Sequence, residues 1–332
     1  MVDECYAKHS AVPRQRKVSV RRLGEDEMAD GNFEILDDRF KRSVKVDEPI
    51  DRLWTGGRWT EGPVYVPAFK CLIWSDIPND RRMRWDETTG TVGTFQGGSG
   101  AYTNGSTLDR QGRLVSCEHG NRRVVRIEPD GSTTVLADRH QGKRFNSPND
   151  VVVKSDGSIW FTDPAYGIES DYEGFAAEPE VDGEHVYRID PASGACTRVA
   201  DDFACPNGLA FSLDETRLYI ADSGGTRYPS GERHIRAFDV SDDGRLSGGE
   251  VFAECTSGVF DGFRLDNQGR LWTSAADGIH CYHTDGTLIG KVRMPEEVSN
   301  LCFGGAKRNR LFVTASTSVY TVLLATSGPK LF

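Results

Sequence analysis

Residues 147–163 read Ser-Pro-Asn-Asp-Val-Val-Val-Lys-Ser-Asp-Gly-Ser-Ile-Trp-Phe-Thr-Asp, and this stretch holds the unit that decides the fold. It opens on the polar residue Asn149, continues as a short apolar run, turns at 155–157 and returns as a second apolar run. An Asp-Gly turn between runs of β-branched and aromatic residues is typical of an antiparallel hairpin. The stretch therefore predicts two paired strands behind a polar opening.

The same kind of opening occurs six times along the chain, at intervals of 39 to 58 residues. Each opening is followed by a mostly apolar run and then by second and third strand-like segments. The openings begin at Glu61, Asn104, Asn149, Asn207, Asp261 and Asn300. The second strands are expected at residues 71–75, 113–117, 158–162, 217–221, 270–274 and 310–314. A loose period of this length indicates repeated structural units, and units made only of strands are typical of propeller blades.

We expect an all-β protein: a six-bladed β-propeller of four-stranded antiparallel sheets that occupies residues 33–332 as a single domain. The sixth unit has room for about three strands, so an N-terminal strand at 33–36 or 52–55 is expected to complete the last blade and close the ring. A seventh blade would need another opening before residue 60, and none is there. Residues 1–32 are polar, with a basic stretch at 14–22, and are expected to form a poorly ordered N-terminal arm.

Composition limits the classes of partner and compartment. The 332 residues carry a net charge of −10, which argues against nucleic acid and anionic membranes as partners. The start of the chain does not resemble a signal peptide, and no apolar segment is long enough to span a membrane. The eight cysteines include no C-x-x-C pair, so we expect buried thiols in a reducing compartment and a cytoplasmic location.

The six polar openings suggest a site for a cation. The first strand of each blade lines the channel, so all six openings are expected at one mouth of that channel. Glu61 and Asp261 are anionic, whereas Asn149 and Asn207 offer neutral carbonyl oxygens. Such a set balances a divalent cation, and oxygen ligands favour Ca²⁺, Mg²⁺ or Mn²⁺ over Zn²⁺. The competing interpretation of each residue is ordinary turn-forming chemistry.

Several motifs resemble the gluconolactonase/senescence-marker-protein family over about residues 33–325. They are Thr60-Glu-Gly-Pro, Cys117-Glu-His-Gly, Ser147-Pro-Asn-Asp-Val-Val, Trp160-Phe-Thr-Asp-Pro, Pro206-Asn-Gly-Leu-Ala-Phe-Ser and Phe260-Asp-Gly-Phe. The resemblance implies a six-bladed propeller with a divalent cation in the channel. By it, Glu61, Asn149, Asn207 and Asp261 are the cation ligands, Asn104 contacts the substrate, and Asp150 supports the ligand Asn149 from behind. Tyr102 departs from the pattern, because some members have Arg there.

The resemblance further implies hydrolysis of sugar lactones, with carbohydrate metabolism as the setting. One divalent cation, Ca²⁺ first, with Mg²⁺, Mn²⁺ or Zn²⁺ as alternatives, would polarise the lactone carbonyl while water attacks. Asp261 is the first candidate for the base and His119 the second, the latter also as a sugar contact. The long loop at 164–185 is expected to be a lid, with Tyr166 beside the substrate and Tyr102 as a further contact. No covalent nucleophile is indicated, since G-x-S-x-G and H-E-x-x-H are absent from the sequence.

Two other functions use the same predicted site. A phosphotriesterase-like activity would rely on similar cation ligands, and a calcium-binding propeller without catalysis would rely on the metal alone. The sequence leaves open which aldonolactone is used, the metal and the oligomeric state. It assigns no task to Asn300 beyond a possible strand cap.

Overall fold

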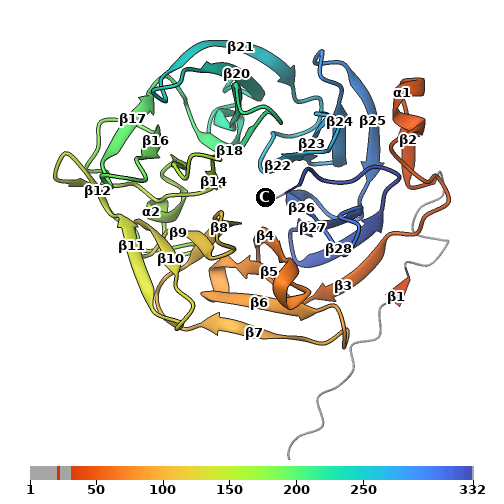
Figure 1. The fold of residues 1–332 in the computed structure, drawn as a ribbon, viewed down its shortest axis with the longest axis horizontal. Coiled ribbons are helices and arrows are strands. Elements are labelled where there is room, and N and C mark those ends of the chain that lie inside the picture. Colours follow the sequence, from red (N-terminus) through yellow and green to blue (C-terminus); the bar gives the residue numbers. More distant parts are fainter. Residues whose placement is uncertain (1–20, 23–30, 331–332) are drawn as a thin grey trace, which may run out of the picture.

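The structure is a computed structural model of the chain and describes residues 21–22 and 31–330. Six sheets follow one another around a central channel as the blades of a propeller (Figure 1). The predicted six-bladed all-β architecture is therefore confirmed. The predicted arm at 1–32 lies largely outside the described residues.

Within each blade the strands run outward from the channel in antiparallel order. The first blade has β4 (Thr60–Val66), β5 (Cys71–Asp76), β6 (Arg81–Asp86) and β7 (Val92–Gly97); the second has β8 (Thr103–Leu108), β9 (Leu114–Glu118), β10 (Arg123–Ile127) and β11 (Thr133–Ala137). The third has β14 (Val151–Val153), β15 (Ile159–Asp163), β16 (His185–Ile189) and β17 (Cys196–Ala200); the fourth has β18 (Pro206–Phe211), β19 (Arg217–Asp222), β20 (His234–Val240) and β21 (Leu246–Glu254). The fifth has β22 (Phe263–Leu265), β23 (Leu271–Ala275), β24 (Gly278–Tyr282) and β25 (Leu288–Arg293), and the sixth begins with β26 (Val298–Gly304), β27 (Arg310–Ala315) and β28 (Ser318–Leu323).

Short elements join or flank the blades. They are α1 (Asp38–Lys41), η2 (Pro67–Phe69), η3 (Ile77–Asn79), the small hairpin β12 (Arg139–His140) and β13 (Lys143–Arg144), α2 (Tyr166–Glu169) and η4 (Gly224–Thr226). Of these, η3, α2 and η4 each follow the second strand of a blade. They therefore lie on the face where second strands end.

The N-terminal segments close the ring and extend two blades. β3 (Asp51–Thr55) pairs with β28 and gives the sixth blade its fourth strand, as the second of the two predicted alternatives required. β2 (Phe33–Ile35) pairs instead with β25 of the fifth blade, so the expectation that residues 33–36 could complete the sixth blade is wrong. β1 (Arg21–Arg22) pairs with β3 at the outer edge of the sixth blade.

The antiparallel pairing within blades places the polar openings together. The start of each first strand lies opposite the end of the second strand; Thr103, for example, pairs with Glu118, and Pro206 with Asp222. Neighbouring first strands contact one another in order from β4 through β26 and back to β4. The openings and the loops between second and third strands therefore share one mouth of the channel.

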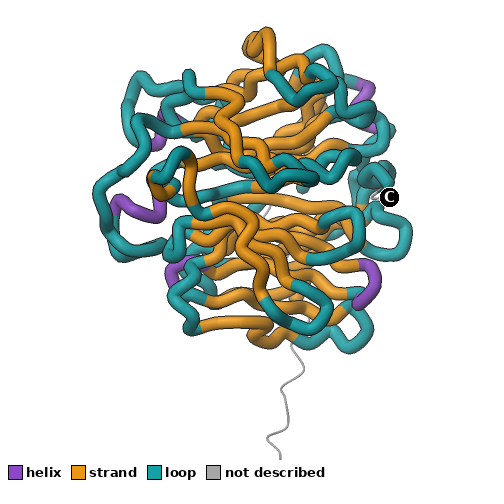
Figure 2. The backbone as a smooth tube through the Cα atoms, turned by 60° about the vertical axis from the view of Figure 1, so that its left-hand side comes forward, coloured by secondary structure: helices purple, strands orange, loops and turns teal. Residues whose placement is uncertain are grey.

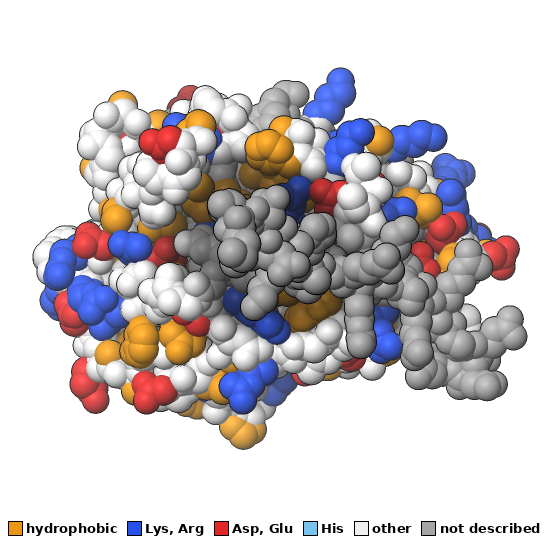
Figure 3. Space-filling model, turned by 90° about the horizontal axis from the view of Figure 1, so that it is seen from below, with side chains coloured by type: hydrophobic (Ala, Val, Ile, Leu, Met, Phe, Trp, Pro, Cys, Tyr) orange, Lys and Arg blue, Asp and Glu red, His pale blue; other side chains and the backbone are white. Residues whose placement is uncertain are grey.

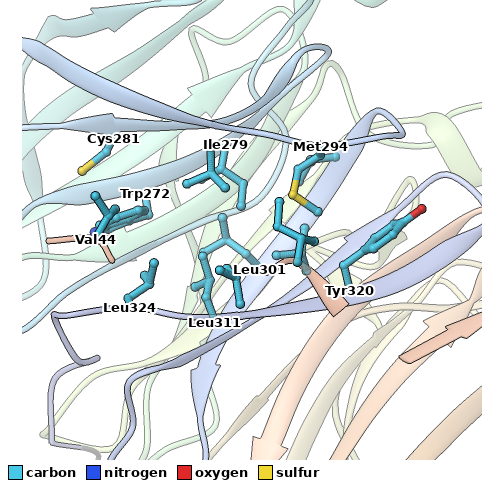
Figure 4. Close-up of a cluster of buried hydrophobic side chains, with 14 of the residues drawn as sticks. Val44, Trp272, Ile279, Cys281, Met294, Leu301, Leu311, Tyr320 and Leu324 are labelled. Carbon is cyan, nitrogen blue, oxygen red and sulfur yellow. The ribbon is translucent and has the colours of Figure 1, made fainter. Parts of the chain in front are cut away.

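Apolar side chains fill the spaces between blades. Figure 4 shows the cluster between the fifth and sixth blades, where Trp272, Ile279, Leu301 and Leu311 are fully buried. The ring of Phe40, from α1, lies 5.7 Å from that of Trp272 and extends the cluster outward. This packing holds the blades at fixed positions, which a site built from several blades requires.

Buried carboxylates at the ends of second strands fix the chain just before several openings. Asp76 accepts a hydrogen bond from the backbone N–H of Arg58 at 2.9 Å, and Asp163 accepts one from that of Asn146 at 2.8 Å. Asp222 accepts two, from the residues at 204 and 205. These carboxylates therefore have a structural task, since they satisfy backbone donors that would otherwise be buried without partners.

The described residues carry surface charges of both signs, and their cysteines are unpaired. On the side shown in Figure 3, acidic and basic side chains lie intermixed over the described residues. The seven cysteines from Cys71 to Cys302 are all free thiols, and five of them are buried. Across residues 21–22 and 31–330, no helix is long and apolar enough to cross a membrane.

Candidate functional site at one mouth of the channel

Irregular pairing turns the opening residues toward the channel. The register between first and second strands shifts between Glu61 and Val64, between Thr103 and Ser106, and between Pro206 and Leu209. Such bulges interrupt the ladder and redirect a side chain. Asn149 and Asp261 lie just ahead of β14 and β22, outside the regular ladder. The openings therefore project from the rim of the channel instead of continuing the strand pattern.

The glycine that follows an opening residue allows neighbouring blades to approach closely. A Cβ atom on Gly208 would lie 2.2 Å from the carbonyl oxygen of Asp261 in the next blade. A Cβ atom on Gly105 would lie 2.4 Å from the carbonyl oxygen of Asn149. Real side chains do not tolerate such distances, so glycine is required here for backbone contact between adjacent openings. This contact explains the recurrent polar-residue–Gly pair in the sequence.

The two acidic residues of the ring lie near each other in a poorly hydrated site. Glu61 is 3% exposed; its Oε2 accepts hydrogen bonds from Asn300 Nδ2 at 3.0 Å and from the backbone N–H of Gly62, while its buried Oε1 has no partner among the described residues. Burial, and then the charge of Asp150, raises the pKa of Glu61. Burial, and then the charge of Glu61, raises the pKa of Asp261. The pair therefore needs a compensating positive charge to stay ionised.

The two asparagines complete a set of oxygens without protein partners. Oδ1 of Asn207 is buried and accepts no hydrogen bond from any described residue. The side chains of Asn149 and Asp261 likewise make no hydrogen bond to the described part of the chain, although the backbone of Asp261 is held by Ser274 at 2.8 Å. Buried polar atoms are normally paired, so the unpaired oxygens of Glu61 and Asn207 mark a place for a ligand, with Asn149 and Asp261 at the same mouth.

The donor set fits a hard divalent cation. Two carboxylates and two amide oxygens are ligands that Ca²⁺ and Mg²⁺ prefer, and they match the charge of such an ion. Among residues 31–330 there is no cluster of three or more His, Cys, Asp and Glu side chains that could hold a metal. The four residues include no histidine or cysteine, the ligands on which a typical zinc site draws.

Asp150 lies behind the ring and is paired with a cation of the protein itself. Its Oδ2 accepts a hydrogen bond from Arg264 Nη1 at 3.3 Å, and its Oδ1 accepts one from the backbone N–H of Val151 at 2.8 Å. Arg264 also donates to the carbonyl oxygen of Phe263 at 2.7 Å. Asp150 is thus held in place directly after Asn149, where its charge acts on Glu61 and Asp261.

Asn104 and His119 form a fixed pair in the second blade. Asn104 Nδ2 lies 3.2 Å from His119 Nε2, and His119 Nδ1 lies 3.2 Å from the carbonyl oxygen of Glu173. Burial lowers the pKa of His119 to about 4, so the ring is neutral at pH 7. A neutral ring protonated on Nδ1 donates to Glu173 and accepts from Asn104, and this tautomer satisfies both contacts. It leaves Oδ1 of Asn104, which has no partner among the described residues, as the free end of the pair.

The long loop of the third blade lies over the second blade at this mouth. The ring of Phe175 packs edge-on against that of Tyr102, with centroids 5.2 Å apart. Ser147 fixes the start of the loop, since its Oγ donates to the carbonyl oxygen of Pro164 at 2.6 Å and accepts from the N–H of Gly167 at 2.9 Å. The structure therefore places the loop where a lid was expected.

The two tyrosines predicted as substrate contacts are held in different ways. Tyr102 adopts a positive φ of 44°, and its backbone N–H donates to Asp80 Oδ1 at 2.8 Å. Tyr166, in α2, is hydrogen-bonded to Thr226 at 3.1 Å and carries the guanidinium of Arg227 over its ring. Tyr166 is close enough to Asp261 for that charge to contribute to its raised pKa, after burial as the main cause.

Three features of the site were not found from the sequence. Asn300 holds a carboxylate oxygen of Glu61, a task visible only once the first and sixth blades meet. Arg264 neutralises Asp150, and its position three residues after Asp261 was the available signal. Glu173 lies in the irregular lid; its pKa is raised to about 7 by burial and by Glu169, and its charge reaches Asp261. Nothing in the lid sequence distinguishes Glu173 from its acidic neighbours.

Fold and site together define a six-bladed propeller with an oxygen-rich polar centre at one mouth of its channel. The chain belongs to the SMP-30/gluconolactonase/LRE-like family, whose profile matches residues 59–317. It is similar to a gluconolactonase of Zymomonas mobilis, with 31% identity over 87% of this chain and 85% of the relative. It is also similar to pentonolactonase XacC of Haloferax volcanii, with 31% identity over 79% of this chain and 83% of the relative. A solved gluconolactonase structure from Xanthomonas campestris superposes with a TM-score of 0.82 at 38% identity, covering 89% of this chain and 95% of that one.

Proposed function

We propose that this protein is a metal-dependent hydrolase that opens sugar lactones to aldonic acids. The observation that carries the proposal is the pair of buried, unpartnered oxygens on Glu61 and Asn207 at the channel mouth that also holds Asn149 and Asp261. The relatives named as gluconolactonase and pentonolactonase support the lactone as the substrate class. We propose Ca²⁺ as the cation, held by these four residues, with Mg²⁺ and Mn²⁺ as alternatives suited to the same oxygen donors.

A bound divalent cation would polarise the lactone carbonyl and offset the negative charge that develops on its oxygen as water attacks. Other side chains of the protein hold the proposed cation ligands in position. Asn300 donates to Glu61 and fixes the orientation of that carboxylate. Asp150, neutralised by Arg264, keeps the backbone next to Asn149 in place. Groups that orient ligands in this way commonly tune affinity by one to two orders of magnitude, roughly 10–100-fold.

We assign the proton transfer to Asp261. Its carboxylate has no hydrogen bond to another described residue and is therefore available to accept a proton from the attacking water. His119 is less suited to that task because both of its ring nitrogens already have partners. We assign to His119 the orientation of Asn104, whose free Oδ1 would accept a hydrogen bond from a sugar hydroxyl. Tyr102 and Tyr166 would bound the sugar from the lid side.

The test is turnover on a lactone panel, followed by pH-stat titration of the acid released. D-Glucono-1,5-lactone and a pentonolactone are the substrates, and an organophosphate ester is the comparison. The proposal expects lactone turnover well above the organophosphate rate. Preferred turnover of the organophosphate would favour a phosphotriesterase-like enzyme, and metal binding without turnover of any substrate would favour a calcium-binding propeller.

The variant Asp261→Asn, measured in the same assay, distinguishes the role of Asp261 as the base from its role as a cation ligand. The amide keeps an oxygen for the cation but cannot accept the proton, so turnover should fall by about 100-fold or more while metal still binds. Asn309→Ala is a control in the sixth blade, because the side chain of Asn309 donates only to the carbonyl oxygen of Leu324, at 3.2 Å. Unchanged turnover of Asp261→Asn with metal bound would remove Asp261 as the base.

We also propose a reducing compartment, and the cytoplasm as the setting. The support is that the seven cysteines from Cys71 onward are unpaired and mostly buried.

A further inference from the structure

A cavity opens at the mouth of the channel opposite the polar openings. It has a volume of about 490 Å³ and lies where first strands end, with walls from β4, β8, β14, β18, β22 and β26. The C-terminal segment reaches this mouth, and Pro329 and Lys330 form part of the wall. Figures 1 and 2 show the last described segment, which follows β28, running to the centre of the ring and to one side of it. The openings that carry the lactone site lie at the other ends of the same strands.

Basic side chains exceed unpaired acidic ones around this cavity. Its lining includes Arg110, Arg264, Arg308 and Lys330 against Asp214 and Glu215. Glu215 is already engaged by Arg110 at 2.8 Å and by the N–H of Ser155 at 2.9 Å. Asp214 accepts from Ser212 and Thr216 within its own turn. Arg110 is thus neutralised by Glu215 and Arg264 by Asp150, which leaves Arg308 and Lys330 against the single charge of Asp214. The lining therefore keeps a net positive charge for a ligand, in a protein whose net charge is −10.

Among the arginines that line the cavity, Arg308 has a buried side-chain nitrogen without a hydrogen-bond partner in the described part of the chain. Its Nε is buried and has no hydrogen-bond partner among the described residues, and no carboxylate there forms an ion pair with it. Its backbone is nevertheless fixed, because its N–H donates to Gly305 at 3.0 Å and its carbonyl oxygen accepts from Gly328 at 2.8 Å. Burial lowers the pKa of its guanidinium, as expected for a cation short of partners. A guanidinium on a fixed stretch of backbone, without an ion-pair partner among the described residues, is well suited to a carboxylate or phosphate.

The remaining wall is largely apolar. Val153, Phe211, Leu213, Leu265 and Phe303 line it. A concave apolar site with a few convergent polar groups is the usual form of a small-molecule pocket, and about 490 Å³ lies within the range of such pockets. The combination calls for a compact molecule with one anionic group and an apolar body.

We propose that the cavity at this opposite mouth is a second ligand site, for a small organic anion whose carboxylate or phosphate is held by Arg308 and Lys330. It is separate from the lactone site, and it needs no metal. Arg264 lies between the two, but its donors already serve Asp150 and Phe263. Arg308 has no part in the proposed lactone chemistry, so the two sites can be tested independently.

Isothermal titration with phenyl phosphate and phenylacetate tests the proposal, using the full chain with Ca²⁺ and again after metal removal. Benzyl alcohol serves as the neutral analogue. We expect at least one anion to bind with a Kd of about 1 mM or tighter in both preparations, and to bind more weakly as salt is added. We expect benzyl alcohol to bind at least ~10-fold more weakly.

Variants then locate the binding. Arg308→Gln should weaken it by ~10-fold or more, and Lys330→Gln by a smaller factor. Arg310→Gln is the matched control, since Arg310 lies over the ring of Trp85 outside the cavity. Circular dichroism checks that each variant folds. The proposal is overturned if neither anion binds, if benzyl alcohol binds equally well, or if metal removal abolishes binding. It is also overturned if Arg308→Gln binds the anion as the wild type does. If Arg308→Gln does not fold, unchanged binding by Lys330→Gln overturns it instead.

Discussion

Replacing Asn300 by alanine is the sharpest test of how the sixth blade supports the cation site. Asn300 is 1% exposed, and its Nδ2 donates to Glu61 Oε2 at 3.0 Å. Its own Oδ1 accepts from the N–H of Leu301 at 2.8 Å, which fixes the direction of the amide group. The substitution removes the donor that orients the Glu61 carboxylate and leaves the rest of the ring intact.

The expected loss of Ca²⁺ affinity follows from the kind of hydrogen bond that the substitution removes. A hydrogen bond to a charged group contributes ~1.5–3 kcal/mol. Loss of a partner that orients a ligand commonly costs ~10–100-fold in metal affinity. We therefore expect the Kd for Ca²⁺ to rise by about 10–100-fold, which corresponds to ~1.4–2.7 kcal/mol. Lactone turnover at saturating Ca²⁺ should change much less.

Calorimetric titration of Ca²⁺ into metal-stripped protein measures the affinity, and turnover as a function of Ca²⁺ concentration gives an independent value. Asn309→Ala is the matched control, because Asn309 also lies in the sixth blade but bonds Leu324 away from the site. A Ca²⁺ affinity in Asn300→Ala equal to that of the wild type would refute the role assigned to Asn300. Equal losses in both variants would point to a general effect on the blade.

Two further predictions concern backbone contact and pH. Gly208→Ala should reduce lactone turnover by about 10-fold or more, because its Cβ would lie 2.2 Å from the carbonyl oxygen of Asp261 and must displace that residue. Gly93→Ala, in the outer strand β7 with open space around it, is the control, and equal activities of the two variants would contradict the prediction. Burial raises the pKa of Asp163 to about 8, so the folded protein holds a proton there that the unfolded chain releases near pH 4. Stability therefore falls as pH rises from about 4 to 8, by up to ~1.4 kcal/mol per pH unit from this group, and Asp163→Asn should remove that slope in urea unfolding; an unchanged slope would contradict the assignment.

The sequence was sufficient for the elements whose pattern is local. The second strands are rich in aromatic and β-branched residues and follow short turns, and β5, β15 and β19 lie within one residue of their predicted ranges. The pairing of residues 33–35 was not predictable in this way. Phe33 and Ile35 suit the edge of any blade, and their pairing with β25 is decided by contacts with a distant part of the chain, including the packing of Phe40 against Trp272.

The residues of the candidate site also divide into those with a local sequence pattern and those that depend on distant contacts. Glu61, Asn207 and Asp261 could be proposed because polar residues recur at equivalent points of the repeat, and because the motifs around them resemble those of the family. The structure adds that the close approach of neighbouring blades requires the glycine after each. The roles of Asn300 and His119 depend on partners in other parts of the chain. No periodic pattern reports such partners, because side-chain hydrogen bonds between blades leave no spacing in the sequence.

The central claim, that the oxygens at this channel mouth hold a cation needed for lactone hydrolysis, is tested most directly by one measurement. Turnover of D-glucono-1,5-lactone is measured on thoroughly metal-stripped protein and again after addition of Ca²⁺, with metal content determined for both samples. We predict that stripping abolishes enzymatic turnover above the spontaneous rate and that Ca²⁺ restores it. Full turnover in the stripped protein would contradict the account.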